Sequence, residues 1–154
     1  MKKISLIIIA ILMTITLLGC NQGSYKIVQI FSHWWTSSPA DLWINYPTIN
    51  GFTIRDTSEL NDVLNIFLEM ENNYEQSFFE NHGLIVMPFP YNIISDIRLG
   101  DLEPQSNGIL IVNINGDFTR GSDMDMFKVI VIRVPQNKLA EILTAELSVS
   151  GLRE

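Results

Sequence analysis

The strongest structural signal in the chain is the run Phe127-Lys128-Val129-Ile130-Val131-Ile132-Arg133-Val134. Its many β-branched residues and its end at Pro135 predict a strand. Two further runs, 84–89 and 109–114, are almost wholly apolar and predict buried strands as well. The second half of the chain is therefore expected to form the centre of a sheet.

Weaker β signals surround these runs. Residues 27–31 and 52–54 predict short strands, and residues 95–102 alternate between apolar and charged side chains around Gly100, which favours a bulge or a turn. The stretch Gln105-Ser106-Asn107-Gly108 is typical of a hairpin connection. A polar loop is expected from Asn115 to Asp125.

Two amphipathic helices are expected to flank the strands. Asp56 and Glu59 have the spacing of a capping box, and the apolar residues that follow predict a helix over about 57–71. These residues are Leu60, Val63, Leu64, Phe67 and Leu68. Asn137 is expected to cap a final helix whose apolar face consists of Leu139, Ile142, Leu143 and Leu147. A short helical turn is expected to carry Tyr74, Phe78 and Phe79.

This order of elements predicts one domain over residues 25–154. Strands grouped between two helices are typical of the α+β class. We therefore expect an antiparallel or mixed sheet with two helices packed on one face. A domain of this length buries enough surface to fold without a disulfide, which a chain with a single cysteine requires.

The N-terminus has the pattern of a targeting segment. Lys2 and Lys3 precede a run from Ile4 to Leu18 that is apolar except for one serine and two threonines. This run is shorter than the roughly 20 residues that span a bilayer, and it fits the hydrophobic region of a signal peptide. We therefore expect residues 1–19 to be removed.

The apolar run ends at Leu17-Leu18-Gly19-Cys20, which has the order of a bacterial lipobox. In that interpretation Cys20 receives a diacylglyceryl group, its new amino terminus is open to acylation by a fatty acid such as palmitate, and residues 20–24 form a short tether to the domain. Two or three acyl chains make a stable anchor. The prediction is a lipid-anchored protein of the cell membrane or outer membrane, with its domain outside the cytoplasm. An uncleaved signal anchor and an ordinary secretory signal are the alternatives.

The charge balance argues against nucleic acid as a partner. The chain has 10 Lys and Arg against 17 Asp and Glu, a formal net charge of −7, and the signal peptide contains two of the basic residues and none of the acidic ones. Phosphate binding requires clustered basic side chains, and the remaining basic residues form no run.

Catalytic and metal-binding patterns are weak. His33 and His82 are far apart in the sequence and lack the spacing of a helical metal site, so we expect no cofactor and no metal. His82 is interpreted as a loop or capping side chain. Asp117, Asp123 and Asp125 lack the spacing of a calcium loop, and a solvated acidic hairpin is the simpler interpretation. Glu69 and Glu71 are interpreted as surface charges.

An aromatic cluster provides the candidate partner-binding residues, Trp34, Trp35, Trp43 and Tyr46. Adjacent residues of a strand point to opposite faces, so one of Trp34 and Trp35 is expected to be exposed if they lie on a strand. Exposed aromatic side chains are common in protein interfaces and can also stack on sugars. The alternative is that the cluster closes the core of the domain.

Part of the chain resembles a known family. The residues concerned are the Glu59 helix, Tyr74-Glu75-Gln76-Ser77-Phe78-Phe79-Glu80, Gly83-Leu84-Ile85-Val86, Gly108-Ile109-Leu110-Ile111-Val112 and the strand 127–134. They resemble the PrcB-like C-terminal domain found in small lipoproteins related to the accessory subunit of a spirochaetal protease complex. The resemblance implies a non-catalytic domain that binds or stabilises another exported protein.

We therefore expect a lipid-anchored, non-enzymatic envelope protein that binds another envelope protein. The alternative from another class is a small envelope hydrolase or a glycan-binding module that uses the surface of Trp34, Trp35 and Trp43.

Overall fold

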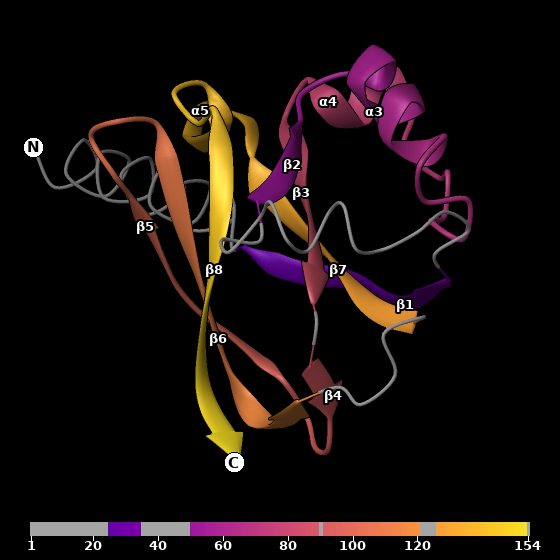
Figure 1. Ribbon diagram of the computed structural model, residues 1–154. Helices are drawn as coiled ribbons and strands as arrows, with labels where there is room; N and C mark the ends of the chain where they lie inside the picture. The colour runs from indigo at the N-terminus through magenta and orange to yellow at the C-terminus, as the bar shows by residue number, and fades with distance from the viewer. Residues whose placement is uncertain (1–24, 35–49, 90, 121–125, 154) are drawn as a thin grey trace, which may run out of the picture.

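A computed structural model describes residues 25–34, 50–89, 91–120 and 126–153 (Figure 1). Within these residues the chain forms eight strands and three helices. In chain order they are β1 (Lys26–Trp34), β2 (Asn50–Ile54), α3 (Thr57–Leu64), α4 (Gln76–Phe79), β3 (His82–Phe89), β4 (Tyr91–Ile93), β5 (Arg98–Pro104), β6 (Ile109–Arg120), β7 (Met126–Pro135), α5 (Gln136–Leu139) and β8 (Thr144–Arg153). Among the described residues, no helix is long and apolar enough to cross a membrane.

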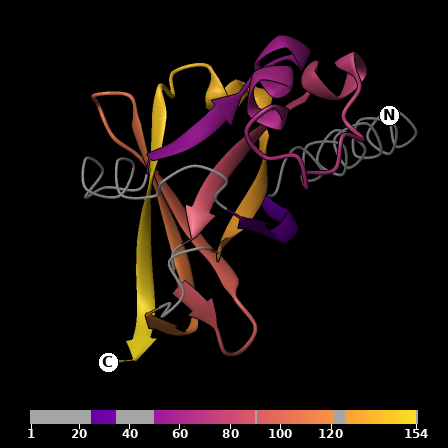
Figure 2. The same ribbon diagram turned by 45° about the vertical axis from the view of Figure 1, so that its right-hand side comes forward.

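The strands form one curled sheet that resembles half a barrel (Figures 1 and 2). The strand order is β1-β7-β3-β2-β8-β6-β4, with β5 also paired to β6. The β6–β8 pair is parallel and the others are antiparallel. Strand β2 links the two halves, because Phe52–Ile54 pair with β3 whereas Asn50 and Gly51 pair with β8. A Cβ atom at Gly51 would lie 2.8 Å from Met87 Cγ, so glycine permits this close approach.

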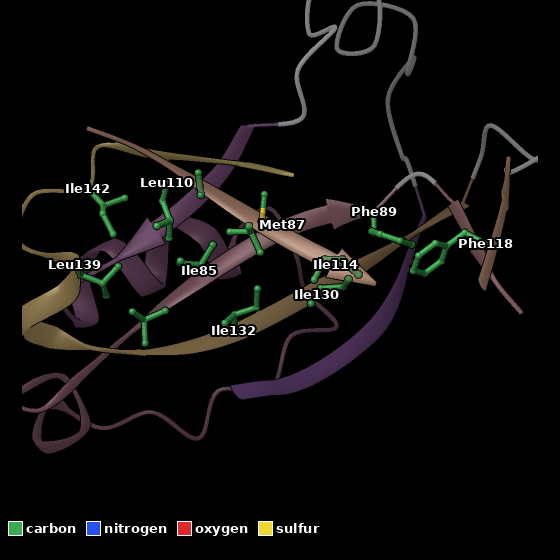
Figure 3. Close-up of a cluster of buried hydrophobic side chains, with 13 residues drawn as sticks. Ile85, Met87, Phe89, Leu110, Ile114, Phe118, Ile130, Ile132, Leu139 and Ile142 are labelled. Carbon is green, nitrogen blue, oxygen red and sulfur yellow. The ribbon is translucent and has the colours of Figure 1, made fainter. Parts of the chain in front are cut away.

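The central strands β3 and β7 are covered on both faces. Side chains inside the curl form an inner cluster, shown in Figure 3, that includes Ile85, Met87, Phe89, Ile130, Ile132, Leu110, Ile114 and Phe118. On the other face, Leu84, Val86, Val129 and Val131 join Leu60, Val63, Phe67 and Met70 in an outer cluster beneath α3 and the segment that follows it. Burial on both faces explains why these two strands are continuous apolar runs.

The predicted α+β class is wrong, because the structure is mostly β rather than a sheet with two helices packed on one face. The described helices contain only 8, 4 and 4 residues. Helix α3 begins as predicted, since Asp56 Oδ1 accepts hydrogen bonds from the Ser58 and Glu59 amides. It ends at Leu64, and turns bring Phe67 and Met70 into the outer cluster while Leu68 stays 80% exposed. The helical spacing of apolar residues in the sequence therefore extends beyond the end of the helix that forms.

The predicted C-terminal helix is also wrong. Helix α5 ends at Leu139, and the Leu143 amide donates to the Gly108 carbonyl, which ties the chain to the β5–β6 hairpin. Residues 144–153 then form β8, where Leu147 pairs with Val112 instead of lying on a helix face. Leu139 and Ile142 are buried as expected, whereas Leu143 is exposed.

Several local predictions are confirmed. Strands form at 27–31, 52–54, 84–89, 109–114 and 127–134, and the hairpin connection lies at 105–108. Helix α4 contains Phe78 and Phe79 as predicted, whereas Tyr74 precedes it. A bulge interrupts the pairing of β5 between Leu99 and Leu102, next to Gly100. The predicted loop from Asn115 is wrong at its start, because β6 continues to Arg120 past a register shift between Asn115 and Phe118.

Candidate functional site

Only one of the four candidate aromatic residues, Trp34, lies in the described part of the chain. Trp34 is the last residue of β1 and pairs with Met126 of β7. Trp35, Trp43 and Tyr46 lie outside the described residues, as does the predicted lipid-attachment residue Cys20. A binding role for the four aromatic residues therefore remains a prediction, and the described element that includes Trp34 is β1.

Strand β1 is the first strand of the sheet order. Antiparallel pairing joins one of its edges to β7, and among the described residues no strand pairs with the opposite edge. Its only Lys, Arg, Asp or Glu residue is Lys26, at its start. Val28 and Ile30 are 36% and 41% exposed. The strand is nine residues long and largely apolar, and a register shift between Ile27 and Gln29 interrupts its pairing with β7. From Gln29 onward it is the kind of edge that pairs with another extended chain.

The segment after α3 lies over one face of β1. Gln29 Nε2 donates to the Glu69 carbonyl over 3.5 Å, and the Glu71 amide donates to Gln29 Oε1 over 3.3 Å. His33 Nδ1 lies 2.7 Å from Glu69 Oε2. We call residues 69–71 the acidic overhang. These contacts join β1 to a segment some forty residues further along the chain.

The pair between His33 and Glu69 belongs to the packing of the outer cluster. The His33 ring is buried, with its centroid 5.1 Å from that of Phe67 and 5.4 Å from that of Phe127, both edge to face. The hydrogen bond from His33 lowers the pKa of the Glu69 carboxyl, against a smaller opposing effect of burial. Glu69 is thus hydrogen-bonded to a buried ring rather than only a surface charge, and its side chain remains 41% exposed.

The second histidine also has a packing role. His82 is the first residue of β3, and its ring stacks on Phe78 at 5.3 Å. Phe78 in turn contacts Tyr74, with ring centroids 4.8 Å apart. Burial raises the pKa of the Tyr74 hydroxyl, with a further contribution from the charge of Glu71. His82 therefore belongs to an aromatic row rather than to the predicted loop or cap.

A polar groove of about 320 Å³ lies on the outward face of β5, β6 and β8. It is lined by Gly100, Asp101, Glu103, Asn113, Asn115, Ser148 and Ser150. Asn113 Nδ2 donates to the Asp101 carbonyl and to Glu103 Oε1, both over 2.9 Å, and so closes the β5 bulge. Ser150 donates to Asn115 Oδ1. The groove lining contains no aromatic side chain, so it does not correspond to the predicted tryptophan surface.

The remaining predicted groups lie partly inside and partly outside the described residues. Asp117 lies on β6, while Asp123 and Asp125 are outside the described residues. No group of three or more His, Cys, Asp or Glu side chains among the described residues has the geometry to hold a metal ion. His33 faces a carboxylate, but the pair is packed between Phe67 and Phe127 and does not line the groove.

Sequence reasoning missed the link between β1 and the acidic overhang. The partners are separated by 36 to 42 residues, and no local pattern connects them. The one available signal was the apolar, nearly uncharged character of residues 27–32.

Comparison of the chain with models of protein families, with curated proteins and with solved structures gives no match. The resemblance to the PrcB-like domain therefore remains a prediction that rests on the residues quoted for it.

Proposed function

We propose that this chain is a lipid-anchored envelope protein whose β domain binds another exported protein without catalysing a reaction itself. The observation that carries the proposal is the edge of β1, where Val28 and Ile30 are exposed on an almost uncharged strand. Exposed apolar side chains at a sheet edge are favourable positions for contact with a protein partner.

The position of β1 in the chain supports the same function. The proposed tether of residues 20–24 spans at most about 18 Å when fully extended. A lipid on Cys20 would therefore hold the start of β1 near the bilayer, where exported proteins attached to the same membrane are concentrated. The acidic character of the chain suits a protein partner rather than a nucleic acid.

Position-specific cross-linking in the producing cells tests the binding function. A photoreactive amino acid is placed at Ile30 in one version of the full chain and at Asp101 of β5 in another. Asp101 is a matched control because it is also exposed and lies on an edge strand. We expect a cross-linked product with an exported protein from position 30 and none from position 101. Equal products from both positions, or none from position 30, would contradict the proposal.

The anchor has a separate test. Cys20→Ala removes the only cysteine of the chain, so it should abolish incorporation of radiolabelled fatty acid and leave an uncleaved precursor. Labelling that continues in this variant would show that the lipobox interpretation is wrong, while leaving the binding function open to the cross-linking test.

A further inference from the structure

We infer that the partner contributes an extended, amphipathic segment that adds to the sheet as a strand beside β1, with apolar side chains on one face and basic side chains on the other. The inference rests on the proposed binding function and specifies the chemistry of the partner.

The two faces of β1 differ, and the difference dictates the pattern of the added segment. Ile30 pairs with Ile130 and lies on the side of the inner cluster, whereas Phe31 pairs with Val129 on the side of the outer cluster. From Gln29 onward, beyond the register shift between Ile27 and Gln29, a strand added beside β1 keeps the same alternation, because side chains of neighbouring strands in register share a face. Its residues therefore alternate between the Ile30 face and the face of the acidic overhang.

The face of Ile30 favours apolar residues. Ile30 is 41% exposed there, so an apolar neighbour would remove its side chain from water. Lys128 also lies on this face, where its ammonium group donates to Ser32 Oγ over 2.7 Å. Lys128 would repel a basic side chain at this position.

The opposite face favours basic residues beside the acidic overhang, whereas Lys26 and Arg133 lie on the same face at the start of β1. The acidic overhang is held over β1 by the contacts of Gln29 and His33 with residues 69–71. Glu69 and Glu71 are both exposed, so their carboxylates can meet cations from solvent. Basic side chains directly beside them would gain attraction, which weakens in salt.

The main-chain groups of the edge supply the remaining interactions. An edge strand presents unpaired amides and carbonyls along one side, and strand addition pairs them regardless of the sequence of the partner. Main-chain pairing provides affinity, and the two unlike faces provide selectivity. The expected ligand is therefore an extended stretch of alternating apolar and basic residues.

Binding of synthetic peptides to the full lipidated chain in neutral detergent micelles tests this inference. The probe is a fluorescein-labelled eight-residue peptide of alternating Val and Lys, and fluorescence anisotropy measures its affinity. The matched peptides are one of alternating Val and Glu and one in which a central Val of the first peptide is replaced by Pro. We expect at least tenfold weaker binding for each, because Glu faces the acidic overhang and Pro removes a main-chain donor.

Variants of the protein locate the site. Ile30→Lys should weaken binding of the Val/Lys peptide at least tenfold, whereas Leu143→Lys, at an exposed leucine beyond α5, should leave it unchanged. Glu71→Lys should weaken binding at least threefold, whereas Glu80→Lys should not.

The outcomes are distinct. Strand addition at β1 would be overturned if the Val/Lys and Val/Glu peptides bound with equal affinity, or if the proline peptide bound as tightly as the Val/Lys peptide. It would also be overturned if the control variants lost as much affinity as the variants at Ile30 and Glu71. Self-association of the chain that Ile30→Lys abolishes, in place of peptide binding, would identify a second copy as the occupant and also overturn it. If peptide binding fails while position 30 still cross-links to an exported protein in cells, the proposed function survives and only strand addition is rejected.

Discussion

Strand β1 contains one charged residue, Lys26, whereas strand β5 at the opposite end of the sheet contains three charged residues and a proline. Both strands have a register shift, between Ile27 and Gln29 in β1 and between Leu99 and Leu102 in β5. Strand β5 includes Arg98, Asp101, Glu103 and Pro104 within seven residues, and its neighbour β4 has only three residues. Charges, bulges, proline and short length are the features by which proteins prevent unwanted strand pairing. Within the described residues, the β5 edge is therefore better protected against association than the β1 edge.

The two edges also differ in how their neighbours hold them. At the β5 edge, Asn113 bonds within the same pair of strands and closes the bulge. At the β1 edge, Gln29 and His33 reach a separate segment, the acidic overhang. The comparison indicates that the β5 edge is fixed by its own hairpin, while the β1 edge depends on a contact that is distant in sequence.

The largest expected effect is on self-association of the chain, after removal of the charges that protect the edge of β5. The double variant Asp101→Val, Glu103→Val replaces two edge charges by β-branched apolar residues, so it should convert the isolated chain into a self-associating one. Sedimentation of the detergent-solubilised chain measures this. The matched change on β1, Val28→Asp with Ile30→Glu, should not increase association. A double β5 variant that stays monomeric would show that these charges do not protect the edge.

The next effect concerns the contact between β1 and the acidic overhang. His33→Ala removes a buried ring between Phe67 and Phe127 and the hydrogen bond to Glu69, so it should lower the free energy of unfolding by about 2 kcal/mol. His33→Phe keeps an aromatic ring at this position and should lose less than half as much. Denaturant unfolding compares the two, and equal losses would mean that packing by the ring contributes little.

The side-chain amides of Gln29 and Asn113 allow a matched comparison of the two edges, with a smaller expected effect on stability. Gln29→Ala and Asn113→Ala each remove two hydrogen bonds, and each should cost about 1 kcal/mol in unfolding free energy. Only Gln29→Ala should speed amide exchange in residues 69–71, because only Gln29 bonds there. Faster exchange of that segment in Asn113→Ala would show that the two edges are not independent.

The smallest effect is the pH dependence of the Glu69 carboxyl. Its pKa lies below the usual 4.5 in the folded chain, so the stabilisation that it provides is present above that value and is lost as the pH falls through the lowered one. The group is partly exposed, and its contribution should be at most about 0.5 kcal/mol. The stability difference between the natural chain and Glu69→Gln should shrink as the pH falls below about 4.5. A difference that grows there would contradict this sign.

The sequence predicted the centre of the sheet better than its borders. Runs such as 84–89 and 127–134 are apolar throughout because both faces of β3 and β7 are buried, and this signal is local. The C-terminal error has a physical cause, since Leu139, Ile142, Leu143 and Leu147 fit a helical period. The competing alternation of Ala145, Leu147 and Val149 with polar residues corresponds to the strand that forms.

The candidate surface could be predicted only in part. The apolar composition of residues 27–32 is visible in the sequence, but its place at a sheet edge depends on the strand order. The proximity of Glu69 to His33 depends on where the chain turns after Leu64, which the helical spacing of 60–68 obscured. Contacts between distant segments are set by the packed core and leave no local pattern.

Amide hydrogen exchange of the full chain, with and without the alternating Val/Lys peptide, tests the central claim about the β1 edge most directly. Without the peptide, the outward-facing amides of residues 27–32 should exchange rapidly while those paired with β7 are protected. With saturating peptide, the outward-facing amides should slow at least tenfold, and residues 98–104 of β5 should not change. Amides of 27–32 that are all protected before the peptide is added, or equal protection at β5, would contradict the account.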